Sequence, residues 1–277
     1  MTGPADPGQE LATLAEDLRN WLEIQGGMAA AEAQGELPTT SLPPELVSPV
    51  PPASAAPQRP APSSGPQPPS LQPGAPGMTL PLVQKELGDC KRCGLHHERS
   101  NIVFGVGSPA ADIVFVGEGP GYHEDQSGEP FVGKAGDLLT RIINNVLRLE
   151  REEVYICNVV KCRPPNNRDP KPDEVESCSP FLWKQLDAIQ PAVVVGLGRF
   201  AVQTLLETTE PIGRLRGRAH PFRDACLVPT YHPAYLLRNP QDKRKVLDDM
   251  KLVRKEFEER TGRSLPPALS RSQAGVK

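Results

Sequence analysis

The chain has 277 residues, of which 23% are charged and 38% apolar, and its formal net charge is -3. That length suffices for one or two domains, and no segment approaches the ~20 apolar residues of a membrane span. The start, MTGPADPGQE, lacks the basic and then apolar layout of a secretory signal peptide. These features exclude an integral membrane protein and indicate a cytoplasmic one.

Residues 1–78 are interpreted as an N-terminal arm. Fourteen prolines lie between Pro38 and Gly77, which favours a disordered, Pro/Ala/Ser-rich linker. Leucines at helical spacing predict one short helix over residues 10–25, either a docking helix for an unknown protein or a marginal helix without a partner. The arm carries eight acidic and two basic residues, so the rest of the chain has 29 basic and 26 acidic residues, a net charge of +3. Basic runs such as GRLRGRAH are typical of surfaces that contact a phosphate backbone.

The sequence pattern of residues 79–262 predicts a three-layer α/β domain, and residues 263–277 are interpreted as a polar tail. Apolar runs alternate with helical patterns, which indicates a central, mostly parallel four-stranded sheet flanked by helices. The predicted strands cover residues 112–117, 154–160, 192–198 and 226–232. The predicted helices cover residues 135–148, 173–188, 199–207 and 241–259. Ligands of such sheets bind beyond the carboxyl ends of the strands.

The first strand leads into GEGPGYHEDQSGEPFVGKAG, residues 117–136, which we interpret as a ligand-binding loop. Its glycines allow backbone amides to approach a ligand closely, but the spacing differs from the dinucleotide fingerprint and Pro120 lacks an amide donor. Carboxylates in the loop disfavour a phosphate ligand. We therefore expect a neutral ligand rich in hydrogen-bonding groups, with Phe131 stacked on it.

Six cysteines fall into two kinds. Cys157 and Cys226 lie within predicted strands and are expected to be buried thiols. A tight pair and a second, wider pair are candidate metal ligands: Cys90, Cys93, Cys162 and Cys178. Four cysteines accept either zinc or an iron–sulfur cluster, and spacing alone favours zinc.

Together, GEGPGYHEDQSGEPFVGKAG, NVVKCRPPNNR, HPAYLLRNP and the upstream CKRC resemble the family 4 uracil-DNA glycosylases, the iron–sulfur branch of the uracil-DNA glycosylase superfamily. The resemblance runs from about Leu80 to Phe257. It implies a monofunctional DNA glycosylase of base excision repair in the bacterial or archaeal cytosol, acting on uracil in single- or double-stranded DNA. It also implies that the four candidate cysteines hold a [4Fe-4S] cluster, which replaces the preference for zinc.

The resemblance assigns roles in a pocket for a flipped uracil. Phe131 would stack on the base, Gly117 and Gly119 would bring backbone amides to its rim, and Asn158 would read its O4 and N3–H. His232 would face uracil O2, where charge develops as the glycosidic bond breaks. The candidates for orienting water or offsetting sugar charge are Glu118 and Glu124, which the sequence does not rank.

The motif HPAYLLRNP resembles the family's minor-groove wedge. One of Tyr235, Leu236 and Leu237 would fill the gap left by the base, with Arg238 on a phosphate; the leucines also fit the core side of a helix start. The helix start near Ala135 is a candidate phosphate site. Asn167 is expected to serve a turn beside the cluster.

Two other interpretations stay open at this stage. One is a non-catalytic iron–sulfur protein that binds DNA or carries electrons, which the complete set of pocket residues argues against. The other is a branch that traps uracil-DNA covalently through a histidine on an inserted basic loop, but residues 133–138 read GKAGDL with no insertion. The expected assembly is a monomer.

Overall fold

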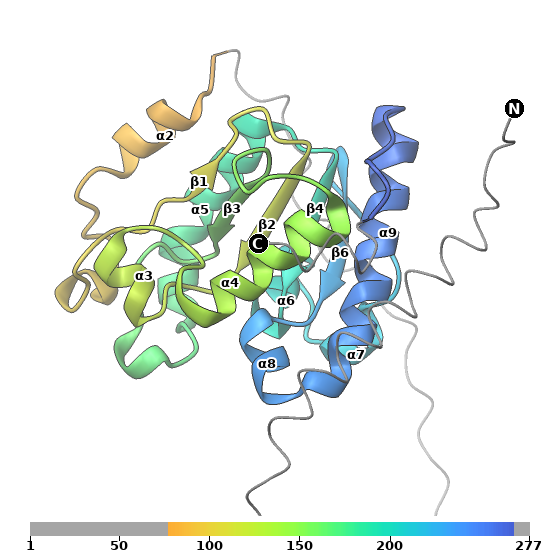
Figure 1. The fold of residues 1–277 in the computed structure, drawn as a ribbon. Coiled ribbons are helices and arrows are strands. Elements are labelled where there is room, and N and C mark those ends of the chain that lie inside the picture. Colours follow the sequence, from red (N-terminus) through yellow and green to blue (C-terminus); the bar gives the residue numbers. More distant parts are fainter. Residues whose placement is uncertain (1–76, 269–277) are drawn as a thin grey trace, which may run out of the picture.

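The computed structural model describes residues 77–268 of the chain. These residues form a six-stranded sheet with helices on both faces (Figure 1). The strands are β1 (Val106–Gly107), β2 (Ile113–Gly117), β3 (Tyr155–Asn158), β4 (Val193–Leu197), β5 (His220–Phe222) and β6 (Ala225–Thr230). Their order across the sheet is β1-β3-β2-β4-β6-β5. The inner four strands are parallel and the two edge strands are antiparallel to their neighbours. The helix expected at residues 10–25 lies outside the described residues.

The inner strands are buried on both sides, as their unbroken apolar runs predict. Every residue of β2, β3, β4 and β6 is buried. Successive side chains point to opposite faces, so Val114 and Val116 pack in one core cluster while Ile113 and Phe115 pack in the other. The β-branched run of β4 suits this pleated surface.

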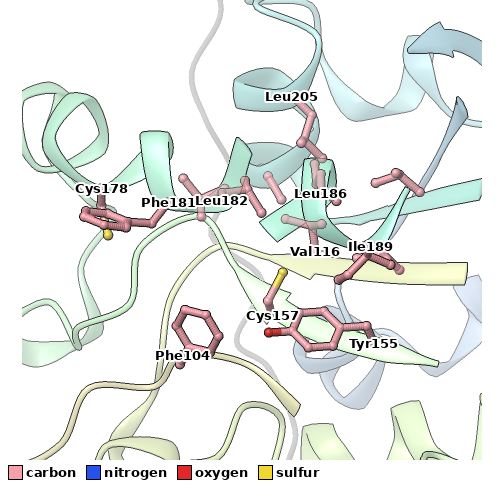
Figure 2. Close-up of a cluster of buried hydrophobic side chains, with 14 of the residues drawn as sticks. Phe104, Val116, Tyr155, Cys157, Cys178, Phe181, Leu182, Leu186, Ile189 and Leu205 are labelled. Atoms are coloured by element: carbon pink, nitrogen blue, oxygen red, sulfur yellow. The ribbon is translucent and has the colours of Figure 1, made fainter. Parts of the chain in front are cut away.

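Three helices pack on the first face: α2 (Leu80–Leu87), α5 (Pro172–Ile189) and α6 (Arg199–Leu205). Figure 2 shows part of this first core cluster, where Leu182 and Leu186 of α5 lie near Val116. Cys178 is one turn before Leu182 on the same helix and is also part of the cluster. The cysteine is therefore placed by the packing of α5 on the sheet.

The second face is covered by α4 (Gly133–Ile142), the π-helical turn η2 (Ile143–Leu147), α8 (Pro233–Arg238) and α9 (Lys243–Thr261). The core continues past the predicted domain boundary at residue 262, because Leu265 is buried in this second cluster. Arg254 of α9 donates to the Leu265 and Pro266 carbonyls, each at 2.9 Å. The segment after Gly262 thus begins as packed chain rather than as a polar tail.

The remaining elements are α3 (Tyr122–Ser127), α7 (Ile212–Leu215) and the 3-10 turns η1 (Gly94–His97), η3 (Pro165–Asn167) and η4 (Pro240–Asp242). The predicted four parallel strands and four main helices are confirmed, with ends shifted by a few residues and the first helix finishing in η2. Helix α3 lies within the segment expected to be a loop. Its first turn is stabilised by Glu124 and it ends at Gly128, whose φ is 78°.

The longest helices, α5 and α9, contain 18 and 19 residues. Neither these nor any other helix between residues 77 and 268 is long and apolar enough to cross a membrane.

Candidate active site

The carboxyl ends of β2 and β3 meet at Gly117 and Asn158, which are partners in the parallel register. The pairing continues beyond the strands, since Val159 N donates to Gly117 O at 2.9 Å. A β-carbon on Gly117 would overlap Asn158 Oδ1 and lie 2.6 Å from Phe131 Cζ. Glycine is therefore required for the Asn158 amide and the Phe131 ring to close over this strand end.

Phe131 is buried, with 7% of its surface exposed, and its φ is 53°. A non-glycine residue in this left-handed region costs of order 1–3 kcal/mol. Hydrogen bonds from Arg151 and the close approach of Gly136 to the Phe131 carbonyl hold this backbone conformation. Arg151 donates to the carbonyls of Pro130 at 2.6 Å and Phe131 at 3.2 Å, and a β-carbon on Gly136 of α4 would overlap the Phe131 carbonyl. The ring position is thus fixed by its surroundings.

Asn158 presents an unsatisfied polar atom to this site. The residue is 2% exposed, and its buried Oδ1 has no hydrogen-bond partner among residues 77–268. A buried acceptor in that state costs about 1–3 kcal/mol. A carboxamide offers an acceptor and donors side by side, so the position suits a ligand with an N–H group beside a carbonyl.

His232 lies at the start of α8, across the site from Asn158. Its ring centroid is 5.4 Å from that of Phe131, with 32° between the ring planes, and a β-carbon on Gly198 would lie 2.9 Å from His232 Cβ. Nδ1 accepts a hydrogen bond from Ala234 N at 3.1 Å. Burial lowers the pKa of His232 to about 4, and Arg238 adds to the decrease. The ring is therefore neutral near pH 7 and, because Nδ1 accepts, carries its proton on Nε2.

Glu118 follows Gly117 directly and is half-buried. Its carbonyl accepts from Val160 N at 3.1 Å, which places it above the β3 end. Burial raises the pKa of the Glu118 carboxyl to about 7; the carboxylate of Asp169 adds to this, and Arg199 opposes it. Asp169 and Arg199 are themselves an exposed ion pair at 2.7 Å. Glu118 thus has the near-neutral pKa typical of acid–base groups in active sites.

Glu124, the other acidic candidate, is occupied by the backbone. Its Oε2 accepts from Gly121 N at 3.1 Å and its Oε1 accepts from Val132 N at 3.0 Å. The carboxylate joins the start of α3 to the residue after Phe131. This geometry favours a role for Glu124 in shaping the loop and leaves Glu118 as the carboxylate at the strand end.

Helix α8 separates the three wedge candidates. Leu236 is 1% exposed and belongs to the second core cluster, whereas Leu237 is 43% exposed. Tyr235 is held on both sides, since its hydroxyl donates to Asp242 Oδ2 at 2.6 Å and its ring stacks 4.9 Å from that of Tyr231. Only Leu237 of the three is both apolar and free to contact another molecule.

The four candidate cysteines gather where the segment around η1 meets the chain after β3 and the first turns of α5. They are free thiols in the first core cluster or packed against it. Three sulfurs accept hydrogen bonds: Cys90 from Arg92 at 3.2 Å, Cys162 from Arg99 at 3.5 Å and Cys178 from the Lys161 amide at 3.3 Å. Burial raises the pKa of Cys178, and the nearby thiols of Cys93 and Cys90 add to that increase.

This donor set fits an iron–sulfur cluster in its chemistry, because thiolates are the usual ligands and N–H donors beside the sulfurs stabilise their charge. In the described part of the chain, no group of three or more His, Cys, Asp or Glu side chains is arranged for a single metal ion. Cys157 and Cys226 are buried within β3 and β6, as predicted.

Comparison with known proteins places this constellation in a family. The model of the uracil DNA glycosylase superfamily matches residues 104–251. The chain belongs to this superfamily. The matched segment contains the strand ends with Gly117, Asn158 and His232, as well as Phe131 between them.

Several curated type-4 uracil-DNA glycosylases are similar to this member of the superfamily. The protein of Sulfurisphaera tokodaii is 45% identical over 184 residues, covering 64% of this chain and 84% of its own. That of Archaeoglobus fulgidus is 47% identical over 180 residues, covering 62% and 89%. That of Thermotoga maritima is 45% identical over 173 residues, covering 61% and 90%.

Sequence reasoning missed one residue beside the pocket of this glycosylase-family chain. Lys161 is fully buried, and its Nζ donates to Asn158 O at 2.7 Å and to Gln185 Oε1 at 2.5 Å. Gln185 of α5 in turn donates to Phe104 O and the Tyr155 hydroxyl. A single lysine after a strand gives no sequence signal of burial, because most lysines are solvated.

Proposed function

We propose that this protein is a monofunctional uracil-DNA glycosylase, which flips uracil out of DNA and hydrolyses the bond between the base and the sugar. The product is an abasic site, the first intermediate of base excision repair. The observation that carries the proposal is the arrangement around Gly117, which brings together the Phe131 ring, the Asn158 amide with its unpaired oxygen and the neutral His232 imidazole. The similar type-4 uracil-DNA glycosylases support the choice of base.

Recognition rests on Phe131 and Asn158. The flipped base stacks on the Phe131 ring, and the Asn158 amide pairs with its edge: Oδ1 accepts from N3–H while Nδ2 donates to O4. A cytosine edge has the opposite pattern at both positions, so it would leave the buried Oδ1 without a donor. Sites that lose such hydrogen bonds discriminate strongly.

His232 acts on the leaving group. As the C1′–N1 bond breaks, its electron pair moves into the uracil ring and negative charge grows on O2. A neutral His232 with its proton on Nε2 donates a hydrogen bond to that oxygen, and the Ala234 amide holds the tautomer. This donor stabilises the transition state more than the bound substrate.

Glu118 acts on the sugar side. In its carboxylate form it orients a water molecule and offsets the positive charge that develops at C1′. The water oxygen bonds to C1′, and the proton it releases neutralises the departing uracil anion. No covalent bond to the protein is needed.

The proposed cofactor is a [4Fe-4S] cluster held by Cys90, Cys93, Cys162 and Cys178. When bound, it supplies a covalent tie between chain segments rather than electrons for the reaction. Cys162 is four residues after Asn158, and Cys178 is on the helix that carries Gln185. The cysteines would thereby steady the strand end that reads uracil.

The proposed partner is uracil-containing DNA, with Leu237 as the wedge and Arg238 on a neighbouring phosphate. The monomeric state, the cytosolic location and a protein partner for residues 1–78 remain predictions of the sequence.

The deciding experiment is a uracil-release assay on a labelled oligonucleotide with one uracil, run beside a denaturing gel. We expect free uracil, an alkali-labile abasic site and no protein–DNA adduct. A stable adduct would indicate covalent trapping, and DNA binding without release would indicate a non-catalytic protein.

A further inference from the structure

An exposed aromatic side chain lies beside the pocket without a role in it. Three large apolar side chains in the described residues are exposed, namely Leu82, Tyr122 and Leu237. Tyr122 is 54% exposed and begins α3. The Arg163 guanidinium lies over its ring, 5.2 Å from the centroid, and His123 meets its edge at 5.6 Å.

The helix that carries Tyr122 is tied to its neighbours. Helix α3 is tied to the Phe131 segment through Glu124, as described above, and to the segment after η1 through Asp125, whose Oδ1 accepts from Ser100 N at 2.9 Å. A β-carbon on Gly133 would lie 3.2 Å from the His123 ring. Arg163 is itself fixed by a hydrogen bond from Nε to Asn167 Oδ1 at 2.8 Å.

The sheet topology sets where this ring lies relative to the wedge. Tyr122 follows β2 and Arg163 follows β3, whereas α8 with Leu237 follows β6, on the far side of β4. These strands are parallel, so α3, which begins at Tyr122, and α8, which contains Leu237, both lie beyond the carboxyl ends of the strands (Figure 1). The strand order places them on opposite sides of β4. A DNA strand that places a base in the pocket therefore has Leu237 on one side and Tyr122 with Arg163 on the other.

We propose that Tyr122 and Arg163 form a stacking subsite for the nucleobase next to the flipped uracil on the β3 side, an inference that rests on the proposed function. An exposed aromatic ring stacks on any base, because every base has a π face. An arginine beside it adds a positive charge for the adjacent phosphate. In single-stranded DNA this neighbouring base is free to stack on Tyr122, whereas in a duplex it stays stacked in its own helix. The subsite thus favours uracil in single strands.

The test measures binding of single-stranded oligonucleotides that carry one non-cleavable 2′-fluoro-deoxyuridine. Tyr122→Ala should weaken binding about ten-fold, Tyr122→Phe should retain the wild-type affinity, and Leu82→Ala, which removes an exposed side chain from α2, should change nothing. Replacing the flanking nucleotides one at a time by abasic spacers should weaken wild-type binding at one position only. At that position Tyr122→Ala should be insensitive to the spacer.

Equal affinity of wild type and Tyr122→Ala for the single-stranded oligonucleotide would overturn the subsite. So would a loss of affinity in Tyr122→Ala that has the same size with every spacer as with the intact oligonucleotide. A wild-type protein that released no uracil would instead overturn the proposed function, so the two failures are distinguishable.

Discussion

Lys161 Nζ lies 2.7 Å from the main-chain carbonyl of Asn158, inside the core and between the end of β3 and the helix that carries Cys178. Its second partner, Gln185 Oε1, belongs to that helix. The pocket and the cysteine segment are therefore joined by buried hydrogen bonds as well as by the chain between them.

Lys161→Met should lower the free energy of unfolding by about 2–4 kcal/mol, because two buried oxygens lose their donor. Excision should slow as the Asn158 strand end loosens. Denaturant unfolding and single-turnover excision would measure both effects. Lys184→Met, which replaces a partly exposed lysine of α5, is the control and should change stability by less than about 1 kcal/mol. Equal stability of the two variants would show that the Lys161 hydrogen bonds make no net contribution to the free energy of unfolding.

Glu118 predicts the pH dependence of excision. Its pKa is raised to about 7, and the carboxylate is the active form, so the single-turnover rate should rise with pH through about 7 and level off above it. His232, with a pKa of about 4, stays neutral over this range and adds no second step. Glu118→Gln should be slow and lose the step near pH 7. A step that persists in this variant would assign it to another group.

His232→Ala should slow excision by about 10²- to 10³-fold, the usual effect of removing a transition-state donor. Affinity for uracil-containing DNA should change little, because the donor acts mainly as charge develops on O2. Stopped-time excision assays and fluorescence anisotropy would separate the two quantities. If affinity fell as far as the rate, His232 would be a ground-state contact.

Adjacent leucines of α8 should respond in opposite ways. Leu237→Ala should reduce excision from duplex DNA while leaving the melting temperature unchanged, because Leu237 is exposed. Leu236→Ala should lower stability by about 2–5 kcal/mol, as expected for a truncated core leucine. Thermal melting and duplex excision of both variants provide the comparison. A Leu237→Ala enzyme as active on duplex as the wild type would exclude it as the wedge.

The cysteines predict a visible cofactor. Protein purified without oxygen should be brown, and Cys162→Ala should lose colour, iron and thermal stability. Cys226→Ala is the control, since Cys226 is buried in the second core cluster, and it should keep its colour and iron. Metal analysis and the visible spectrum measure these outcomes. A colourless, active wild type with stoichiometric zinc would exclude the cluster.

Much of the sheet was predictable, because buried parallel strands are unbroken apolar runs such as Val193–Leu197. The edge strands were not. β1 has two residues and β5 contains Pro221, which sequence patterns treat as a turn signal although edge strands tolerate proline. Helix α3 was also missed, because the glycines around it suggest a loop.

Residue types at the site were easier to predict than their roles. Sequence alone does not rank Glu118 and Glu124, since the difference lies in which carboxylate the backbone amides of Gly121 and Val132 occupy. Leu236 and Leu237 differ only in the helix face they occupy, which depends on where α8 begins. Lys161 resembles any solvated lysine until the strand and α5 close around it.

The strand order has a consequence for synthesis. Strand β6, which carries the chain into His232, is the last of the four parallel strands to be translated, and it joins the sheet beside β4. A nascent chain that has emerged from the ribosome to residue 190 already contains Phe131, Asn158 and all four proposed cluster ligands, but it lacks the histidine. The ligands of the proposed cluster are therefore all synthesised before the proposed catalytic histidine, and a chain that ends before β6 would contain the complete ligand set without His232.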